Sequence, residues 1–455
     1  MKSICKFLFL IALLGNTINV SGKQNSIKPE IFDNIIIQQY KPTDPGCVVL
    51  IAEKGKVIYQ KAFGMANLEL NVPMDTNMIF GIGSITKQFT AIAILQLAEQ
   101  GKLSLEDDIT KYIKDYPTHG YHISIINLLT HTSGIKSFGN IDGWDSNKER
   151  IDFSVDKLID EFKNQAMEFA PGTNWSYGNS GYTLAGKIIE VVSGMSYPQY
   201  LEESLFKPAG MKNTYYGNNQ KIIKKRAYSY QEVNGEKINA EYVSISQRFS
   251  SGSIISTAGD LFNWNEALKK NIVISSKSLE LARTDFKLND GSRTGYGLGW
   301  NISDVNGVLA YEHAGSINGY RSNEIYLPDE DVFVVILTNR DYDSPSDLSV
   351  KIAALAIGRP YQWEPTYKPV NLPEYKGTYI NSQNEKRSIL MEGERLYYMR
   401  NNGEKIKLIP VARDKFQFDQ SFITFHFLRD AKGNVYRVEI KNRIPPMEYW
   451  TKKSL

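Results

Sequence analysis

A serine and a lysine three positions apart at the start of a predicted helix are the residues best placed to do chemistry. The sequence reads GIGSITK from Gly81 to Lys87, and apolar residues then recur at helical spacing until Gly101. One helical turn brings the side chains of Ser84 and Lys87 to the same face. A serine hydroxyl becomes a nucleophile when a nearby base takes its proton, and burial and the helix dipole lower the pKa of a lysine that acts as this base. The pair therefore predicts acyl transfer through Ser84.

The Ser-x-x-Lys spacing is not specific by itself. It also begins at Ser3, Ser133, Ser154 and Ser204. Ser84 differs because glycines precede it and because the apolar helix that follows would bury the pair. A helix-capping serine with an incidental lysine is the alternative that these residues alone leave open.

A second cluster is a tyrosine and an asparagine in the sequence WSYGNSGY, at Tyr177 and Asn179. A phenol beside a lysine can pass the serine's proton to a leaving group, and an amide can orient both partners. The alternative is an ordinary turn, because glycine and asparagine favour turns. Tyr216 and Asn218 repeat the spacing, so the pattern is weak by itself.

A third cluster follows a predicted strand at residues 308–313 and reads His313-Ala314-Gly315-Ser316. An edge strand at this point could direct a side chain to the substrate and a backbone N–H group to a developing oxyanion. The alternative is a histidine that ends a strand before a turn. Each cluster is ambiguous alone, and the order and spacing of the three carry the information.

Together, the three clusters resemble the motifs of the serine β-lactamase and penicillin-binding family. The resemblance is closest to the branch that contains class C β-lactamases, DD-carboxypeptidases and related esterases, because the second motif is Tyr-x-Asn. Three further phrases agree with it: LTHTSG at 129–134, GSIISTAGD at 252–260 and YGLGW at 296–300. The resemblance extends from about residue 45 to residue 357.

The resemblance implies a two-step acyl transfer through an ester on Ser84. Lys87 would exchange the proton of the Ser84 hydroxyl and Tyr177 would relay it, and which of the two acts first as base stays open. Asn179 would bind the amide of the substrate. The backbone N–H groups of Ser84 and Ser316 would form the oxyanion hole.

His313 and Gly315 match the first and last residues of the third motif in this family, where β-lactamases usually have lysine first. A lysine is a permanent cation that holds a substrate carboxylate, whereas histidine is largely neutral near pH 7. Peptidases and esterases of this resemblance often have histidine at this position. The sequence therefore predicts an exported serine hydrolase that cleaves small esters or D-amino-acid peptide bonds.

Other functions fit parts of the same pattern. A class C-like β-lactam hydrolase and a catalytically weak penicillin-recognising sensor or scaffold would both have this fold, although intact Ser84, Lys87 and Tyr177 argue against the sensor. A Ser-His-Asp hydrolase would need His131 or His313 as its base, and the sequence has no Gly-x-Ser-x-Gly elbow.

Two groups of predicted strands flank a helical middle region. Strands at 47–52 and 56–61 form a hairpin, and β-rich segments return at 295–302, 308–313, 320–327 and 332–338 before a last helix at about 345–357. Most of the chain from Ser84 to about Leu268 is typical of helix and loop. The sequence thus predicts an α+β fold of the β-lactamase/transpeptidase type, an antiparallel sheet flanked by helices with a large helical insertion.

Prolines separate the end of the chain from this unit. Residues 359–373 contain four prolines, which predicts a linker with few contacts across it. Short β-rich segments at regular spacing follow in residues 374–455 and predict a small antiparallel β-barrel. This barrel resembles the lipocalin-like extensions of related hydrolases. We expect residues 23–358 to form the hydrolase domain.

The N-terminus is typical of an export signal at residues 1–22. Lys2 and Lys6 provide the positive start, an apolar run follows, and small residues precede a plausible cleavage site at Gly22. The apolar run is too short to span a membrane. We therefore expect an exported protein, periplasmic or extracellular. Removal of the signal leaves Cys47 as the only cysteine and excludes an intramolecular disulfide.

The composition argues against several classes of partner. The formal net charge is +3 over 455 residues and no Lys/Arg block stands out, so we expect no nucleic acid. The five histidines include no His-x-x-x-His pair, which predicts no metal site. No phosphate-binding glycine loop is present, and we expect no cofactor. The expected partner is a small-molecule or peptide substrate, and the oligomeric state stays open.

Overall fold

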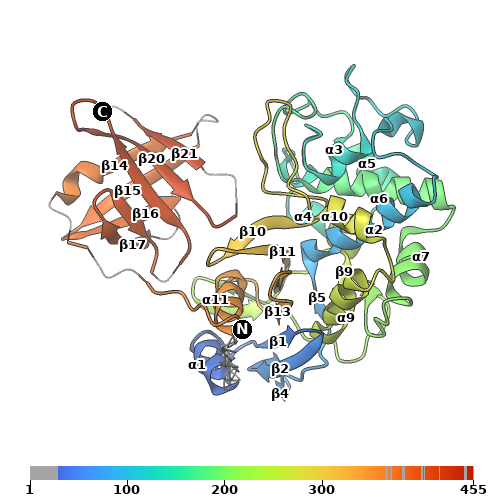
Figure 1. The fold of residues 1–455 in the computed structure, drawn as a ribbon, viewed down its shortest axis with the longest axis horizontal. Helices are drawn as coiled ribbons and strands as arrows, with labels where there is room; N and C mark the ends of the chain where they lie inside the picture. Colours follow the sequence, from blue (N-terminus) through green and yellow to red (C-terminus); the bar gives the residue numbers. More distant parts are fainter. Residues whose placement is uncertain are drawn as a thin grey trace, which may run out of the picture.

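A six-stranded antiparallel sheet in the order β10-β11-β12-β13-β1-β2 organises the main domain (Figure 1). The computed structural model describes residues 29–363, 367–368, 371–381, 385–400, 403, 405–419, 421–444 and 448–453, so the expected export signal lies outside the described residues. The strands of the sheet are β1 (Cys47–Glu53), β2 (Lys56–Phe63), β10 (Asn301–Val305), β11 (Val308–Ile317), β12 (Tyr320–Leu327) and β13 (Val332–Thr338).

A helical region between β2 and β10 packs on one face of this sheet. Its helices are α2 (Thr86–Glu99), α3 (Ile125–Leu129), α4 (Ser146–Glu149), α5 (Val155–Phe162), α6 (Asn179–Ser193), α7 (Tyr197–Leu201), α8 (Phe249–Gly252), α9 (Ala258–Lys269) and α10 (Ser276–Ala282). Its short strands are β3 (Met65–Asn67), β4 (Val72–Pro73), β5 (Phe80–Gly81), β6 (Tyr215–Tyr216), β7 (Tyr230–Val233), β8 (Glu236–Asn239) and β9 (Ile254–Ser256). The terminal helices α1 (Pro29–Gln39) and α11 (Ser346–Ala356) pack on the other face. The predicted α+β fold is confirmed.

The sequence of β1 explains why both faces of the sheet are covered. Successive side chains of a strand point to opposite faces. Val48 and Leu50 lie in the core shared with the helical region. Val49 and Ile51 lie in the core shared with α1 and α11. A strand whose residues are apolar on both faces, as in β1 from Cys47 to Ala52, therefore needs helices on both sides, and β1 has them.

Two expectations about the strands near the third motif are wrong. Residues 295–302 do not form a strand, because Gly295 and Gly299 have φ angles of 70° and 89° and turn the chain, and β10 starts only at Asn301. β11 does not end at His313 but continues to Ile317. Glycines in a left-handed conformation interrupt a strand without changing its apolar pattern, which is why the pattern misplaced the start of β10. The end of β11 was placed too early because the apolar pattern stops at the small residues Ala314, Gly315 and Ser316.

The C-terminal strands close a separate antiparallel barrel, as predicted (Figure 1). They are β14 (Gly377–Ile380), β15 (Lys386–Glu392), β16 (Arg395–Arg400), β17 (Lys405–Ala412), β18 (Lys415–Gln417), β19 (Thr424–Arg429), β20 (Val435–Lys441) and β21 (Glu448–Lys452). Large aromatic side chains, among them Tyr379, Phe416 and Trp450, fill its interior. The barrel thus has a hydrophobic core of its own.

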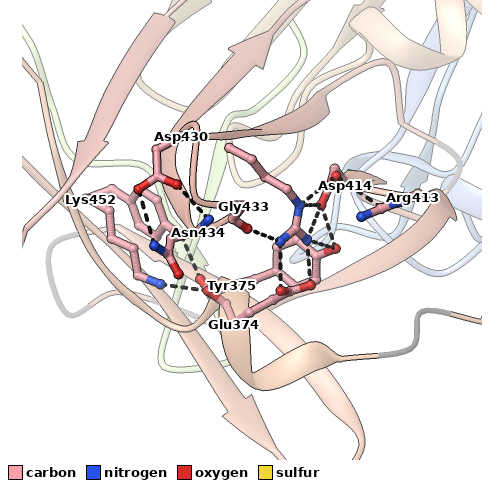
Figure 2. A network of polar contacts seen from close by, with 10 residues as sticks. Glu374, Tyr375, Arg413, Asp414, Asp430, Gly433, Asn434 and Lys452 are labelled. Carbon is pink, nitrogen blue, oxygen red and sulfur yellow. Dashed lines mark hydrogen bonds and ion pairs between the residues drawn. The ribbon is translucent and has the colours of Figure 1, made fainter.

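A polar network ties the turns at one end of the barrel together. Arg429 contacts Glu374 at 2.6 Å and Asp414 at 2.7 Å, and it donates to the carbonyl oxygen of Gly433 at 2.8 Å. Glu374, Asp414 and Gly433 converge in Figure 2. Glu374 belongs to the turn before β14, Asp414 to the β17–β18 hairpin and Gly433 to the β19–β20 hairpin. One guanidinium therefore holds three segments that are distant in the sequence.

Contacts cross the linker, contrary to expectation. The rings of Tyr361 and Trp363 lie 4.6 and 5.3 Å from the ring of Phe422, which follows β18 in the barrel. The Tyr361 hydroxyl accepts a hydrogen bond of 2.6 Å from the backbone N–H of Asn306, in the β10–β11 turn. Prolines stiffen a linker but leave the aromatic side chains between them free to pack. The domain boundaries suggested by the sequence stay a prediction.

The described residues set three further limits. None of their helices is long and apolar enough to cross a membrane. They contain no group of three or more His, Cys, Asp or Glu side chains that could hold a metal ion. Cys47 is a free cysteine buried in β1, and burial raises the pKa of its thiol well above the usual value. It packs as a small apolar residue rather than as a reactive thiol.

Candidate active site

Ser84 lies where a short 3₁₀ turn, Gly83–Ile85, leads into α2. Gly83 has a φ angle of 50°, and a side-chain carbon placed on it would lie 2.5 Å from the backbone nitrogen of Ser316. Only glycine allows the turn to approach β11 this closely. The glycine-rich sequence before the serine thus has a physical role, because it brings Ser84 against the strand that carries the third motif.

Lys87 is fully buried one turn after Ser84. Its Nζ lies 3.0 Å from the Oγ of Ser84, 2.9 Å from the Oδ1 of Asn179 and 2.9 Å from the carbonyl oxygen of Ser251. Burial, and to a lesser degree the nearby cation of Arg248, holds the pKa of Lys87 well below its usual value. The amine is therefore neutral over a wider pH range than an exposed lysine.

The partners of Lys87 determine which way its lone pair points. A neutral amine has two N–H donors and one lone pair. The oxygens of Asn179 and Ser251 can only accept, so they take the two donors. The lone pair is left for the third partner, the hydroxyl of Ser84. This arrangement can remove a proton from Ser84, and it distinguishes the pair from a capping serine beside an incidental lysine.

Tyr177 lies beside the same amine. Its ring centroid is 4.8 Å from the Nζ of Lys87, its side chain hydrogen-bonds Ser84, and it is 38% exposed. Burial of the hydroxyl raises the pKa of Tyr177 well above the usual value, and the contact with Ser84 only partly offsets this. The phenol is therefore protonated at neutral pH and can give a proton to a leaving group.

His131 fixes the segment that carries Tyr177. Its Nδ1 accepts a hydrogen bond of 3.2 Å from the backbone N–H of Gly178, and its ring packs at a tilt of 42° against Tyr177, with 4.3 Å between the ring centroids. Burial lowers the pKa of His131 well below the usual value, and repulsion from the protonated forms of Lys87 and His313 would lower it further. In the sequence, His131 stood out only as part of the phrase LTHTSG and as one of two histidines that could serve as the base of a Ser-His-Asp hydrolase. The described residues provide it with no carboxylate partner, which disfavours a Ser-His-Asp triad.

His313 is buried in the middle of β11 and is neutral. Its Nδ1 donates to the carbonyl oxygen of Ala314 at 2.6 Å, so its Nε2, 3.0 Å from the hydroxyl of Tyr296, is the acceptor. Burial is the main cause that lowers the pKa of His313 to about 3, and repulsion from the protonated form of Lys87 adds to it. Tyr296 is the first residue of YGLGW, a phrase that supported the family resemblance but for which the sequence predicted no contact. The third motif thus presents no cation to a substrate.

Gly315 and Ser316 form a part of β11 that β10 does not cover. The pairing of β10 with β11 ends at Asn301 and Glu312, so residues 313–317 are an edge of the sheet. A side-chain carbon on Gly315 would lie 1.9 Å from the carbonyl oxygen of Ile82, so only glycine fits there. Ser316 is exposed at this edge.

A cavity of about 510 Å³ connects the three motifs. Ser84, Tyr177 and the run from His313 to Ser316 line it. Sequence reasoning missed the residues that close its far side, namely Asn301, Arg321 and residues 341–344. These residues lie at strand ends and in loops, where no sequence motif identifies them. Lys87 and Asn179 do not line the cavity but lie behind its wall. There the side-chain oxygen of Asn179 accepts a hydrogen bond from the amine of Lys87.

The chain is similar to several known proteins. The family model described as Beta-lactamase matches residues 32–359. Penicillin-binding protein 4* of Bacillus subtilis (strain 168) is 30% identical over 396 residues, 81% of this chain and 86% of the relative. The D-aminopeptidase of Gluconobacter oxydans (strain 621H) is 24% identical over 351 residues, 74% of this chain and 63% of the relative. The structure of the octameric penicillin-binding protein homologue from Pyrococcus abyssi has a TM-score of 0.67 and 25% identity, covering 93% of this chain and 99% of that one.

Proposed function

Because the chain belongs to the β-lactamase family and is a serine hydrolase, we propose that it cleaves small esters or D-amino-acid peptide bonds through an acyl-enzyme on Ser84. The observation that carries this proposal is the neutral His313 at the start of the third motif. The similarity to a D-aminopeptidase supports the same class of substrate. A β-lactam hydrolase is the alternative.

In the proposed reaction, the neutral amine of Lys87 takes the proton of Ser84 as its Oγ attacks the carbonyl carbon of the substrate. The backbone N–H groups of Ser84 and Ser316 stabilise the oxyanion, and the first turn of α2 adds its dipole. Tyr177 gives its proton to the leaving group and recovers one from Lys87. Asn179 holds the amine in place. Water then attacks the ester, and the same groups return the proton to Ser84.

The lack of a cation in the third motif affects carboxylated substrates most. β-Lactams carry a carboxylate that a lysine would hold by a charge-assisted hydrogen bond. Such a bond is worth ~1.5–3 kcal/mol, or ~10–150-fold in kcat/KM. We expect kcat/KM to be higher on p-nitrophenyl esters and D-alanine p-nitroanilide than on nitrocefin. Nitrocefin turnover well above both would refute the proposal and favour the β-lactamase alternative.

Replacing His313 by lysine should raise kcat/KM on nitrocefin by up to ~10–150-fold, because it supplies the missing charge-assisted bond. The effect on a neutral p-nitrophenyl ester should be much smaller. Because the pKa of His313 is about 3, wild-type activity on carboxylated substrates should show no gain as the pH falls from 8 to 5. His313→Gln, which stays neutral, is the matched control. A gain at low pH in the wild type but not in this control would mean that His313 titrates in that range.

We also propose that the protein is exported to the periplasm or outside the cell. The support is the sequence of residues 1–22, with its positive start and apolar run. N-terminal sequencing of the protein from fractionated cells tests this. A chain that keeps Met1 and stays with the cytoplasmic fraction would contradict it.

A further inference from the structure

Glu312, the residue before His313 in β11, is a carboxylate with 1% of its side chain exposed. Because side chains alternate along a strand, Glu312 points to the sheet face opposite His313. The hydroxyl of Ser303 in β10 donates to it. A buried carboxylate needs a charged partner, since desolvation otherwise disfavours the fold around it. The described residues of the main domain do not supply that partner.

Arg443 supplies the charge from the barrel, where it follows β20. Its Nη2 binds both carboxylate oxygens of Glu312. Its Nη1 donates to the Oγ of Ser303 and to the carbonyl oxygen of Asp304, each at 2.9 Å. One guanidinium, 11% exposed, thus joins the barrel to both strands of the β10–β11 hairpin. In Figure 1 the barrel lies beside this hairpin.

This contact acts at the last point where β11 has a strand on each side. Glu312 pairs with Asn301 of β10, and the following residues 313–317 have β12 alone. A contact that holds Glu312 in place therefore also sets the direction of residues 313–317, the free edge of β11. Displacement of a reacting group by about 1 Å costs ~10²-fold in rate.

The other charged groups around the pair do not replace Arg443. Asp347 of α11 is itself acidic, and burial raises its pKa. Lys351 of α11 lies 5.3 Å from the ring of Trp363, and burial lowers its pKa. Neither is bonded to Glu312 among the described residues. Arg443 is the cation that binds the carboxylate directly.

We propose that Arg443 is a positioning residue for acyl transfer: by neutralising Glu312 it holds the β10–β11 hairpin, and so the edge that carries His313, Gly315 and Ser316. The barrel is then a part of the catalytic unit and not an appended module. The inference rests on the proposed role of this edge in acyl transfer.

The test compares Arg443→Met with the double variant Arg443→Met/Glu312→Gln in the full-length protein. The single variant should lower kcat by ~10–100-fold with little change in KM, because the unpaired carboxylate shifts the strand but leaves the cavity open. The double variant has no charge to neutralise and should recover most of the lost kcat. Equal rates in the two variants, or a wild-type kcat in the single one, would overturn the proposal.

Arg429→Met is the matched control, because Arg429 also binds two carboxylates but does so inside the barrel. It should lower Tm and leave kcat unchanged. A loss of kcat in Arg429→Met as large as in Arg443→Met would mean that the barrel acts through stability alone. If Arg443→Met does not fold, Arg443→Lys keeps a charge but cannot bridge the same acceptors, and kcat should fall while Tm changes little. An unchanged kcat in that variant would also overturn the proposal.

The rate at which a fluorophosphonate labels Ser84 separates this inference from the proposed function. Labelling needs an intact nucleophile and oxyanion site but no natural substrate. Arg443→Met should label ~10-fold or more slowly than the wild type, even if the substrate class proposed above is wrong. Equal labelling rates would refute the positioning role and leave the proposed hydrolysis untouched.

Discussion

Ser84→Ala is expected to abolish covalent labelling by a fluorophosphonate and to lower kcat by roughly 10⁶-fold, the cost of removing a serine nucleophile in other hydrolases. The reason is that the hydroxyl of Ser84 is the one that lies 3.0 Å from the buried amine of Lys87 and also lines the cavity. Intact mass after labelling and peptide mapping would locate the modified residue. The fold should survive, since the change removes one oxygen.

Ser204→Ala provides the matched control for this result. Ser204 and Lys207 have the same Ser-x-x-Lys spacing, but Lys207 is exposed and pairs with Glu203 at 2.6 Å. Its amine therefore stays charged and cannot act as a base at neutral pH. Ser204→Ala should label and turn over like the wild type. Labelling that persists in Ser84→Ala would show that the nucleophile is elsewhere.

Lys87→Ala should lower kcat by ~10²–10⁴-fold, the usual contribution of a positioned acid–base group. In the wild type, the neutral form of Lys87 is the active one. Since burial lowers the pKa of Lys87, kcat/KM should rise as the pH increases through that lowered value and then level off. The variant should lose this rise. Tyr177→Phe, which keeps the ring and removes the proton donor, should cost a comparable factor.

Lys207→Ala is the control, because it also removes a lysine but one that is exposed and outside the site. It should leave kcat and the pH profile unchanged. Circular dichroism and Tm of each variant separate a chemical loss from unfolding. If Lys87→Ala kept its fold and turned over substrate at a near-normal rate, Lys87 would not be the base. If the rise with pH persisted in that variant, another group would be titrating.

The local sequence predicted those parts of the site that depend on neighbouring residues. The helix that begins after Ser84 was visible because its apolar residues recur at helical spacing, and Gly101, with a φ angle of 68°, ends it where expected. The contact between Ser84 and Lys87 followed from one helical turn. The antiparallel sheet and the barrel were predictable from β-rich segments separated by turn residues.

Contacts between distant segments were not visible in the sequence. His131 contacts the ring of Tyr177, and Tyr296 contacts His313, and neither side chain lies at a spacing that the sequence could connect to its partner. Arg443 lies among other charged residues of the barrel and shows its role only when β11 is beside it. α1 was missed because a single short helix gives little periodic signal. Such features depend on tertiary packing, which local patterns do not encode.

The position of β1 between β2 and β13 has a consequence for how the enzyme is made. β1 ends at Glu53, but its partner β13 is complete only at Thr338, and Gly83 meets Ser316 only when β11 exists. A ribosome adds ~5–20 residues per second, so β1 waits on the order of half a minute for its second neighbour. During that interval the nucleophile has been synthesised but the opposite wall of its cavity has not. The nascent chain is therefore inert, with an apolar strand edge exposed to other chains, until translation has passed the last strand of the sheet.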